Sequence, residues 1–252
     1  PARAVKALTR AVSPALPRCE LTHLSREPID MTRAVYQHRA YEDCLRRLGA
    51  TVISLPAEPE LPDSMFVEDA AVVVDECALI TRPGAPSRRP ECESIARALA
   101  PYRQLHTVQD PGTIDGGDVL RIGRRFFVGI STRTNQEGAR QFATFLARYG
   151  YTTTLVRVHG CLHLKSAATL AGDRVLVNSE WINPAVFDMP HLAVLEPHAA
   201  NVLTLGDTVV VPANFPRTAE MLERAGLRIE RLDISELQKA ESGLTCSSLI
   251  FD

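Results

Sequence analysis

The chain is poor in several features that mark particular classes of protein. It has little excess charge, because 28 Lys and Arg residues stand against 30 Asp and Glu residues, a formal net charge of −2. Proteins that bind nucleic acid or a membrane surface usually carry a basic excess. No apolar run approaches the roughly 20 residues that span a bilayer. We therefore expect no nucleic-acid partner and no membrane partner.

The cysteines lack any pairing pattern. There are six of them, scattered through 252 residues without a CxxC pair. A chain of this length does not need a disulfide framework, and such spacing does not match a structural zinc site. We expect reduced thiols and a cytoplasmic location, with most of the cysteines acting as small buried hydrophobes.

What the chain does have is a repeated order of predicted elements. An apolar strand is followed by a turn, a second strand, a loop, an amphipathic helix and a third strand. Four such units begin near residues 66, 115, 163 and 200, and the helix of the third is short or degraded. A period of roughly 35–50 residues is found in solenoids and propellers. The predicted elements are strands 66–74, 77–81 and 104–108 with helix 91–99; strands 115–122, 126–130 and 152–158 with helix 135–149; strands 163–170 and 174–178; and strands 200–205, 208–212 and 228–232 with helix 216–225.

The two ends of the chain complement each other. A strand at 4–8, a helix at 31–48 and a strand at 51–55 form a fifth unit that lacks its central strand. Residues 244–251 can supply it, so that the last strand closes the first unit. A closed ring leaves no unit unpaired, as in a propeller. We predict a mixed α/β fold, a five-bladed pseudosymmetric α/β-propeller, in a single domain over residues 1–252.

The first strands of the five units would converge on one central mouth, where the last of them places a thiol. Cys246 opens the final apolar run and follows the flexible Glu241-Ser242-Gly243. A thiol at the head of a core strand is fixed in place yet reachable, which a nucleophile needs. The alternative is an inert buried cysteine, which is the commoner case in general.

The heads of three other units carry groups that would serve a reactive thiol. His163 fits either a general acid/base or a structural histidine. Asp115 fits either the carboxylate that orients such a histidine or a residue of the turn Asp115-Gly116-Gly117-Asp118. Glu68 and Asp69 precede an inward-running strand, where an unpaired charge is costly. A cationic substrate would supply the missing partner.

Two polar loops carry arginines that suit an anion. Arg88 lies in the stiff, basic loop 81–90, and Arg133 lies in the loop 131–135. Arginine can clamp a carboxylate through two parallel hydrogen bonds, although either loop also fits a solvated connection. Acids at the centre and arginines at the rim suit a zwitterion with a cationic far end, such as an arginine-like molecule.

Six segments together carry a family resemblance: FVED at 66–69, the loop 81–89, DGGDVL at 115–120, RTN at 133–135, LHLKS at 162–166 and LTC at 244–246. In this order, over nearly the whole chain, they resemble the dimethylarginine dimethylaminohydrolases. The resemblance implies the pentein fold, the five-bladed α/β-propeller of the guanidino-modifying superfamily. It also implies hydrolysis of asymmetric dimethylarginine or monomethylarginine to citrulline and an amine, with no metal and no organic cofactor.

The resemblance further implies a role for each matching residue. The catalytic residues would be Cys246 as nucleophile, His163 as general acid/base and Asp115 as its orienting acid. The guanidinium would be held by Asp69 with Glu68 behind it, and Glu241 would face it as well. The remaining residues would hold the α-amino-acid end: Arg88 and Arg133 its carboxylate, and Asp63 with the backbone carbonyls of Leu21 and Ala240 its ammonium.

Other readings stay open. Arginine deimination or amidinotransfer would use the same Cys–His–acid arrangement, although arginine deiminases are generally longer. A catalytically silent binder of arginine-like ligands would use the same pocket. The polar segment 20–30 is the candidate lid, and a homodimer is left open. Ser247 follows Cys246 where the mammalian relatives carry a second cysteine, so regulation through a second thiol is not expected.

Overall fold

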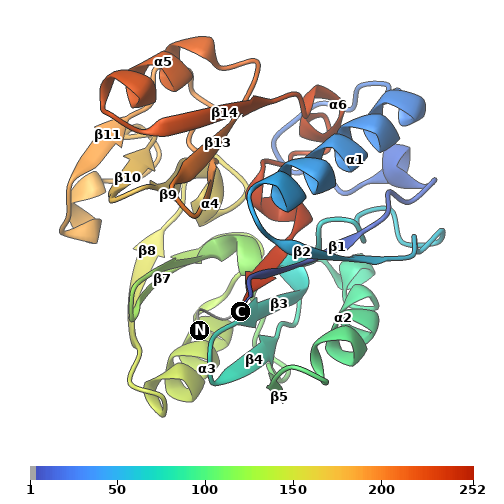
Figure 1. The fold of residues 1–252 in the computed structure, drawn as a ribbon. Helices are drawn as coiled ribbons and strands as arrows, with labels where there is room; N and C mark the ends of the chain where they lie inside the picture. Colours follow the sequence, from blue (N-terminus) through green and yellow to red (C-terminus); the bar gives the residue numbers. More distant parts are fainter. Residues whose placement is uncertain (1–3) are drawn as a thin grey trace.

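The computed structural model describes residues 4–252 and arranges their strands in five three-stranded sheets around a central axis (Figure 1). The sheets are β15-β1-β2, β3-β4-β5, β6-β7-β8, β9-β10-β11 and β12-β13-β14. In each, the first strand is antiparallel to the middle strand, and the middle strand is parallel to the third. This confirms the five-bladed α/β-propeller. The strands are β1 (Lys6–Arg10), β2 (Thr51–Leu55), β3 (Ala71–Val73), β4 (Cys77–Ile80), β5 (Gln104–Thr107), β6 (Val119–Ile122), β7 (Arg125–Ile130), β8 (Thr152–Arg157), β9 (Ala168–Ala171), β10 (Arg174–Val177), β11 (His191–Ala193), β12 (Leu203–Leu205), β13 (Thr208–Pro212), β14 (Arg228–Leu232) and β15 (Leu249–Phe251).

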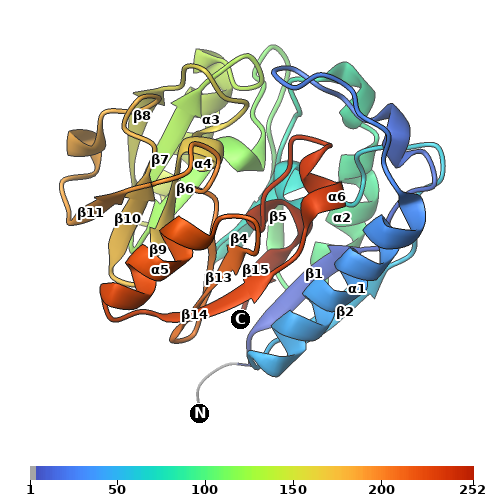
Figure 2. The same ribbon diagram turned by 90° about the horizontal axis from the view of Figure 1, so that it is seen from above.

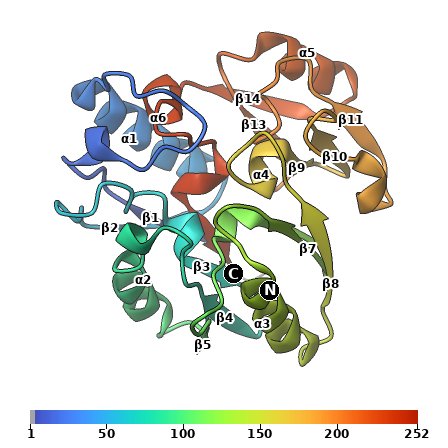
Figure 3. The same ribbon diagram turned by 180° about the vertical axis from the view of Figure 1, so that it is seen from behind.

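Helices connect the parallel strands and lie on the outside of the ring (Figures 1 and 3). A parallel pair needs such a crossover because its strands start at the same edge of the sheet. Four blades use an α-helix: α1 (Met31–Arg47), α2 (Glu91–Leu99), α3 (Gln136–Ala147) and α5 (Pro216–Arg224). The blade of the third repeat has the 3-10 turn η5 (Pro184–Phe187) instead, as its degraded helical pattern indicated. Among residues 4–252, every helix is too short or too polar to cross a bilayer.

Local sequence signals set where the long helices begin and end. The side chain of Asp30 accepts the backbone N–H of Arg33 at 3.0 Å and caps α1, and Asn135 caps α3 by accepting the N–H of Gly138 at 2.8 Å. Gly49 follows α1 with φ of 95°, a left-handed conformation that glycine adopts without strain. The helix predicted at 31–48 and its stop at Gly49 are thereby confirmed.

The last strand completes the first blade, as predicted, and it does so as the first strand of the sheet, with β1 in the middle. β15 runs antiparallel to β1, with Lys6 opposite Phe251 and Leu8 opposite Leu249 (Figure 2). Leu8 and Leu249 are both buried and pack with the neighbouring blade. Closing the ring therefore needs strands from both ends of the described chain.

One expectation about the mouth was wrong. The polar residues at the heads of four units do not belong to strands. They lie in, or cap, single helical turns that precede the strands: η2 (Val67–Ala70), η4 (Gly116–Asp118), α4 (Leu164–Ala167) and η6 (Thr245–Ser247). The inner strands begin only at Ala71, Val119, Ala168 and Leu249. A helical turn lets several consecutive side chains and N–H groups reach the axis, whereas a strand would send every second side chain away from it.

The hydrophobic core is divided among the blades rather than placed on the axis. In the blade of the second repeat, Phe126 and Phe142 meet edge to face with ring centroids 5.0 Å apart, between β7 and α3. Similar clusters fill the space between the other sheets and their helices. This arrangement leaves the axis to the polar groups of the turns.

Candidate active site

The four helical turns and the loops beside them enclose a cavity of about 280 Å³ at the mouth of the ring. Cys246 and His163, predicted from different units, both line it, and so do Glu68 and Glu241. Residues more than 170 positions apart in the chain thus share one small space. The cavity is the place where the chain gathers its reactive groups.

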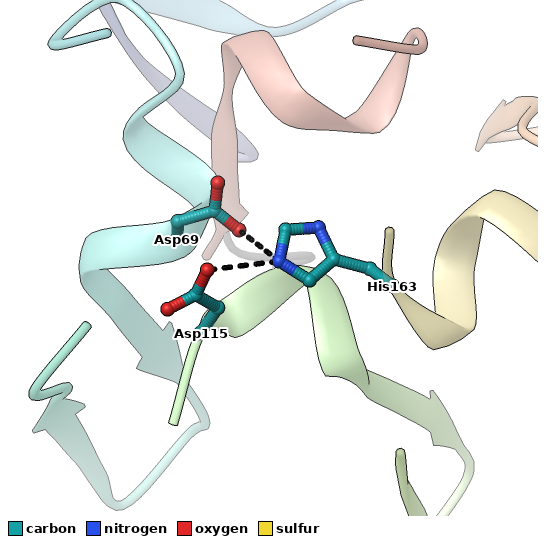
Figure 4. Close-up of side chains that lie close together, drawn as sticks. All are labelled: Asp69, Asp115 and His163. Atoms are coloured by element: carbon teal, nitrogen blue, oxygen red, sulfur yellow. Dashed lines mark hydrogen bonds and ion pairs between the residues drawn. The ribbon is translucent and has the colours of Figure 1, made fainter. Parts of the chain in front are cut away.

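His163 is held by two carboxylates (Figure 4). Its Nε2 donates to Oδ2 of Asp115 at 2.8 Å and lies 4.0 Å from Oδ1 of Asp69. Asp115 is completely buried, and its Oδ1 accepts the N–H of Gly84 at 2.9 Å. Asp115 is therefore fixed by the backbone and in turn fixes the imidazole ring.

These carboxylates decide the charge of the histidine. Burial lowers the pKa of His163, but the negative charges of Asp69, Asp118 and Asp115 outweigh burial and raise it to about 9. Asp118 is itself anchored by the hydroxyls of Ser131 and Thr134, at 2.6 and 2.7 Å. The ring carries its proton at neutral pH, so it is ready to act as an acid.

The same three groups have the chemistry of a cation site. Ligand atoms of Asp69, Asp115 and His163 all lie within 4.8 Å of one another. However, Asp115 already accepts from His163, and Oδ2 of Asp69 accepts from Arg88 at 2.6 Å. A metal bound by Nε2 of His163 and Oδ2 of Asp115 would have to displace the hydrogen bond between them, and Asp69 already has the Arg88 cation as its partner. The cluster therefore fits acid–base work better than metal binding.

The thiol of Cys246 lies in η6, partly exposed to the cavity. Its Sγ accepts the N–H of Gly243 at 3.3 Å. Burial raises the pKa of this thiol, and the carboxylates of Glu68 and Asp69 raise it further. The free protein therefore holds a thiol rather than a thiolate. A cation bound beside these carboxylates would offset them and favour the thiolate.

Glu68 belongs to a network that the sequence did not reveal. Its carboxylate pairs with Lys165 and accepts the hydroxyl of Thr245 at 2.9 Å. Asn201 binds both the N–H of Thr245, at 3.0 Å, and its hydroxyl, at 2.9 Å. Because Thr245 precedes Cys246, this network fixes the turn that carries the thiol. The only feature of the sequence that pointed to Asn201 is its position at the start of the unit that begins near residue 200.

The two predicted arginines are buried, which excludes the solvated-loop alternative for both. Arg88 donates to Oδ2 of Asp69 at 2.6 Å and to both carboxylate oxygens of Glu91 at 3.0 and 2.9 Å. Arg133 lies 3.4 Å from Oδ2 of Asp115 and donates to the hydroxyl of Thr22 at 3.4 Å. Both guanidinium groups therefore adjoin the acids around His163. Their role toward a carboxylate stays a prediction.

The residues expected at the ammonium of a ligand lie beside the segment 20–30. Asp63 is buried, burial raises its pKa, and its Oδ2 accepts the N–H of Glu20 at 3.1 Å. Leu21 is the next residue of that segment, and Ala240 is buried just before Glu241. Their roles also stay predictions.

Glu241 contacts the segment 20–30, which we call the strap. Its Oε1 accepts the backbone N–H groups of Thr22, His23 and Leu24 at 2.7, 2.6 and 2.6 Å. The expectation that Glu241 faces a guanidinium remains a prediction, since this oxygen is engaged by the strap. The contact was not predictable from two segments more than 200 residues apart.

Part of the cavity lining is aromatic, which the sequence did not indicate. Trp181, the only tryptophan of the chain, lies with its ring centroid 5.4 Å from that of His198. Phe215 and Leu162 line the same cavity. These residues suit an apolar substituent, whereas Glu68, which also lines the cavity, suits a cation.

Comparison with known proteins places this geometry in a family. The chain is 36% identical, over 88% of its length and 90% of the relative, to the N(G),N(G)-dimethylarginine dimethylaminohydrolase of Pseudomonas aeruginosa. It is 39% identical, over 97% of its length and 96% of the relative, to the Streptomyces coelicolor protein of the same name. No family model matches the chain.

Solved structures agree. A Cys-to-Ser mutant of the dimethylarginine dimethylaminohydrolase from Pseudomonas aeruginosa, complexed with citrulline, superposes with a TM-score of 0.93 at 34% identity, over 98% of both chains. The N-terminal domain of a cyanobacterial arginine dihydrolase has a TM-score of 0.83 at 17% identity, which shows a shared fold alone. On sequence and structure together, the chain belongs to the dimethylarginine dimethylaminohydrolase family.

Proposed function

We propose that this protein hydrolyses Nω-methylated arginines, asymmetric dimethylarginine and monomethylarginine, to citrulline and dimethylamine or methylamine. The observation that carries the proposal is the shared cavity: Cys246 and His163 both line it, and Asp115 fixes His163 from behind at 2.8 Å. A thiol beside a protonated histidine is what attack on a carbon followed by departure of an amine requires.

In the first half-reaction, Cys246 becomes the nucleophile only when the substrate is bound. The guanidinium is held at the carboxylates of Asp69 and Glu68, where its positive charge lowers the pKa of the thiol and the proton leaves to solvent. The thiolate adds to the guanidinium carbon to form a C–S bond. His163 gives its proton to the departing dimethylamine, the C–N bond breaks, and a covalent S-alkylthiouronium remains on Cys246.

In the second half-reaction, the now neutral His163 removes a proton from water. The resulting hydroxide adds to the thiouronium carbon and the C–S bond breaks. The hydroxyl proton of the adduct passes to the departing sulfur, so that citrulline leaves and the thiol is restored. His163 thus serves first as acid and then as base. The buried Asp115 keeps its ring in one orientation through both steps.

The α-amino-acid end of the substrate is assigned to the polar side of the site. Arg88 and Arg133 would bind its carboxylate, and Asp63 with the carbonyls of Leu21 and Ala240 would bind its ammonium. Support comes from the position of these groups: Arg88 adjoins Asp69, and Arg133 adjoins Asp115. A substrate carboxylate would compete with these acids for the guanidinium groups.

We also propose that residues 1–252 act as one catalytic domain in the cytoplasm. The ring is closed by β15 and β1, so no blade stands alone, and the six cysteines are free thiols. The partner is a small molecule rather than nucleic acid or membrane. A homodimer is left open.

The test is a citrulline assay on wild type and Cys246→Ser with asymmetric dimethylarginine, monomethylarginine and plain arginine. We expect citrulline from the methylated substrates with wild type alone, and a transient mass increase on the peptide that contains Cys246. Comparable turnover of plain arginine would favour a deiminase. Ligand binding without any citrulline would favour a silent binder.

A further inference from the structure

One carboxylate binds the strap to the segment that leads to the nucleophile. Oε1 of Glu241 accepts three successive backbone N–H groups, those of Thr22, His23 and Leu24, at 2.7, 2.6 and 2.6 Å. Consecutive N–H groups that point at one anion form a nest, and hydrogen bonds to an ionised acceptor are the strong kind. When a side chain of the same protein occupies such a nest, its hydrogen bonds hold two segments of the chain together.

The backbone of Glu241 is held in an unusual conformation to make this contact. Its φ is 56°, in the left-handed region that residues other than glycine rarely adopt. Its second oxygen, Oε2, is buried without a hydrogen-bond partner among residues 4–252. The hydrogen bonds of this carboxylate therefore serve the strap.

Two neighbouring contacts hold the outer half of the strap to the same segment. Nζ of Lys239 donates to the carbonyl of Pro28 at 2.9 Å, and Oε2 of Glu236 accepts the N–H of Asp30 at 2.9 Å. The segment then continues to Gly243, whose N–H reaches Sγ of Cys246. The segment 236–243 thus contacts both the strap and the thiol, and Glu241 is the strap contact nearest to Cys246 in the sequence.

The inner end of the strap adjoins the groups assigned to the α-amino-acid end of the substrate. The N–H of Glu20 binds Asp63 at 3.1 Å, and the hydroxyl of Thr22 accepts from Arg133 at 3.4 Å. His23 and Leu24 line the cavity with Cys246. A shift of the strap would move these groups while leaving the His163–Asp115 pair in place.

We propose that Glu241 is a positioning residue that holds the strap at the cavity and thereby shapes the site for the α-amino-acid end of the substrate. The inference rests on the proposed hydrolysis of methylated arginines. It assigns Glu241 to substrate affinity through the strap and not to the chemistry at the thiol.

The test compares Glu241→Gly and Glu241→Gln with wild type. Glycine removes the carboxylate and suits the positive φ, so that loss of the contact is separated from backbone strain. Glutamine keeps an acceptor oxygen without the charge. For Glu241→Gly we expect KM for dimethylarginine to rise about tenfold with kcat within about twofold, as for lost ground-state positioning. Glu241→Gln should lie between the two.

Two readouts separate the strap from the thiol. Inactivation by chloroacetamidine, an alkylating amidinium without an α-amino-acid end, should stay within about twofold of wild type in both variants. Trypsin should cleave after Arg26, in the strap, faster in Glu241→Gly. Asp233→Asn is the matched control, because this exposed acid of the same region pairs with Arg33 and not with the strap; it should change none of these values.

The proposal is overturned if KM is unchanged in Glu241→Gly, if cleavage after Arg26 is not faster, or if inactivation by chloroacetamidine slows as much as kcat/KM falls. The last result would place Glu241 in the thiol chemistry. Absence of citrulline from the wild type would instead reject the proposed hydrolysis, and the cleavage assay would then decide the role of Glu241 alone.

Discussion

Two carboxylates face one nitrogen of His163, Asp115 at 2.8 Å and Asp69 at 4.0 Å, and this arrangement acts on two residues at once. The negative charges raise the pKa of His163 to about 9 despite its burial. Asp69 also raises the pKa of Cys246, together with burial and Glu68. His163 and Cys246 are therefore both protonated in the free enzyme. A cationic ligand beside these carboxylates would lower the pKa of the thiol while His163 keeps its proton.

This gives a pH dependence whose sign can be worked out. In the free enzyme the pKa of the thiol is raised, so at a pH below this pKa each unit of increase in pH gives about tenfold more thiolate. Between pH 7 and 8.5 His163 stays largely protonated because its pKa is about 9. We expect kcat/KM, which reports the free enzyme, to rise steeply over this range. In the complex the substrate cation lowers the thiol pKa, so kcat should level off at lower pH. Parallel profiles for kcat and kcat/KM would contradict this account.

Gly117 tests how tightly His163 is seated. A Cβ at this position would lie 2.5 Å from Nδ1 of His163 and 2.8 Å from Oδ1 of Asp69. Gly117→Ala must therefore displace the ring, and we expect kcat to fall at least about a hundredfold, the scale of a lost general acid. The control is Gly206→Ala, in an open turn with φ of 61° and no atom near the new Cβ. It should lower the melting temperature and leave kcat intact, so equal kcat for the two variants would refute the steric argument.

At the scale of elements, the single helical turns before the inner strands are the features that make the site. Asp69 lies in η2, Asp118 in η4 and Cys246 in η6, while His163 caps α4. Each turn is fixed by the apolar strand that follows it. The strands therefore set the distances between these side chains. A substitution that displaces an inner strand should also displace the turn before it and the side chains that the turn carries.

β15 allows a direct test of this dependence. Leu249 is 6% exposed and packs with Leu8 and with Val67 of η2, whereas its neighbour Ile250 is half-buried. Leu249→Ala should lower the free energy of unfolding by about 2–5 kcal/mol, as for a cavity in a packed core. Ile250→Ala, the matched control, should cost clearly less. Urea unfolding followed by circular dichroism measures both changes in the free energy of unfolding. Equal decreases would show that the face of β15 that carries Leu249 does not contribute more to stability than the face that carries Ile250.

The sequence predicted the blades far better than the turns. Paired predicted strands such as 115–122 and 126–130 repeat often enough to reveal five units, and the unpaired strand at 244–251 indicates ring closure. A single helical turn such as η4 is too short to show any periodicity, so the sequence pattern predicts the start of a strand there. The pairing of Glu68 with Lys165 depends on a contact between two units, and that of Arg88 with Asp69 on how a loop folds back within one unit. Local patterns encode neither contact.

At the scale of the whole molecule, the ring places the two ends of the described chain side by side. β1 and β15 are adjacent and antiparallel (Figure 2). Every blade contacts two neighbours, and none of the five sheets is left as a free end unit. The arrangement of the blades therefore does not depend on which strand comes first in the chain.

A circular permutant tests this view. Joining residue 252 to residue 4 through a short flexible linker, with new ends in the exposed turn at Gly206 and Asp207, keeps all fifteen strands of the described chain. We expect the permutant to fold with the same circular dichroism spectrum and to keep kcat within about threefold, since exposed turns tolerate such changes. Loss of folding would mean that the native order of strands is itself required.

The order in which the strands are made has a consequence during biosynthesis. β15 is synthesised after the other fourteen strands, so β1 leaves the ribosome with one edge unpaired and keeps it until residues 249–251 emerge. An open strand edge is a site for wrong pairing and aggregation. The thiol of Cys246 arrives three residues ahead of the strand that removes this hazard. The thiol is thus added just before the ring can close. A chain cut short before residue 246 exposes an unpaired strand edge and lacks this thiol.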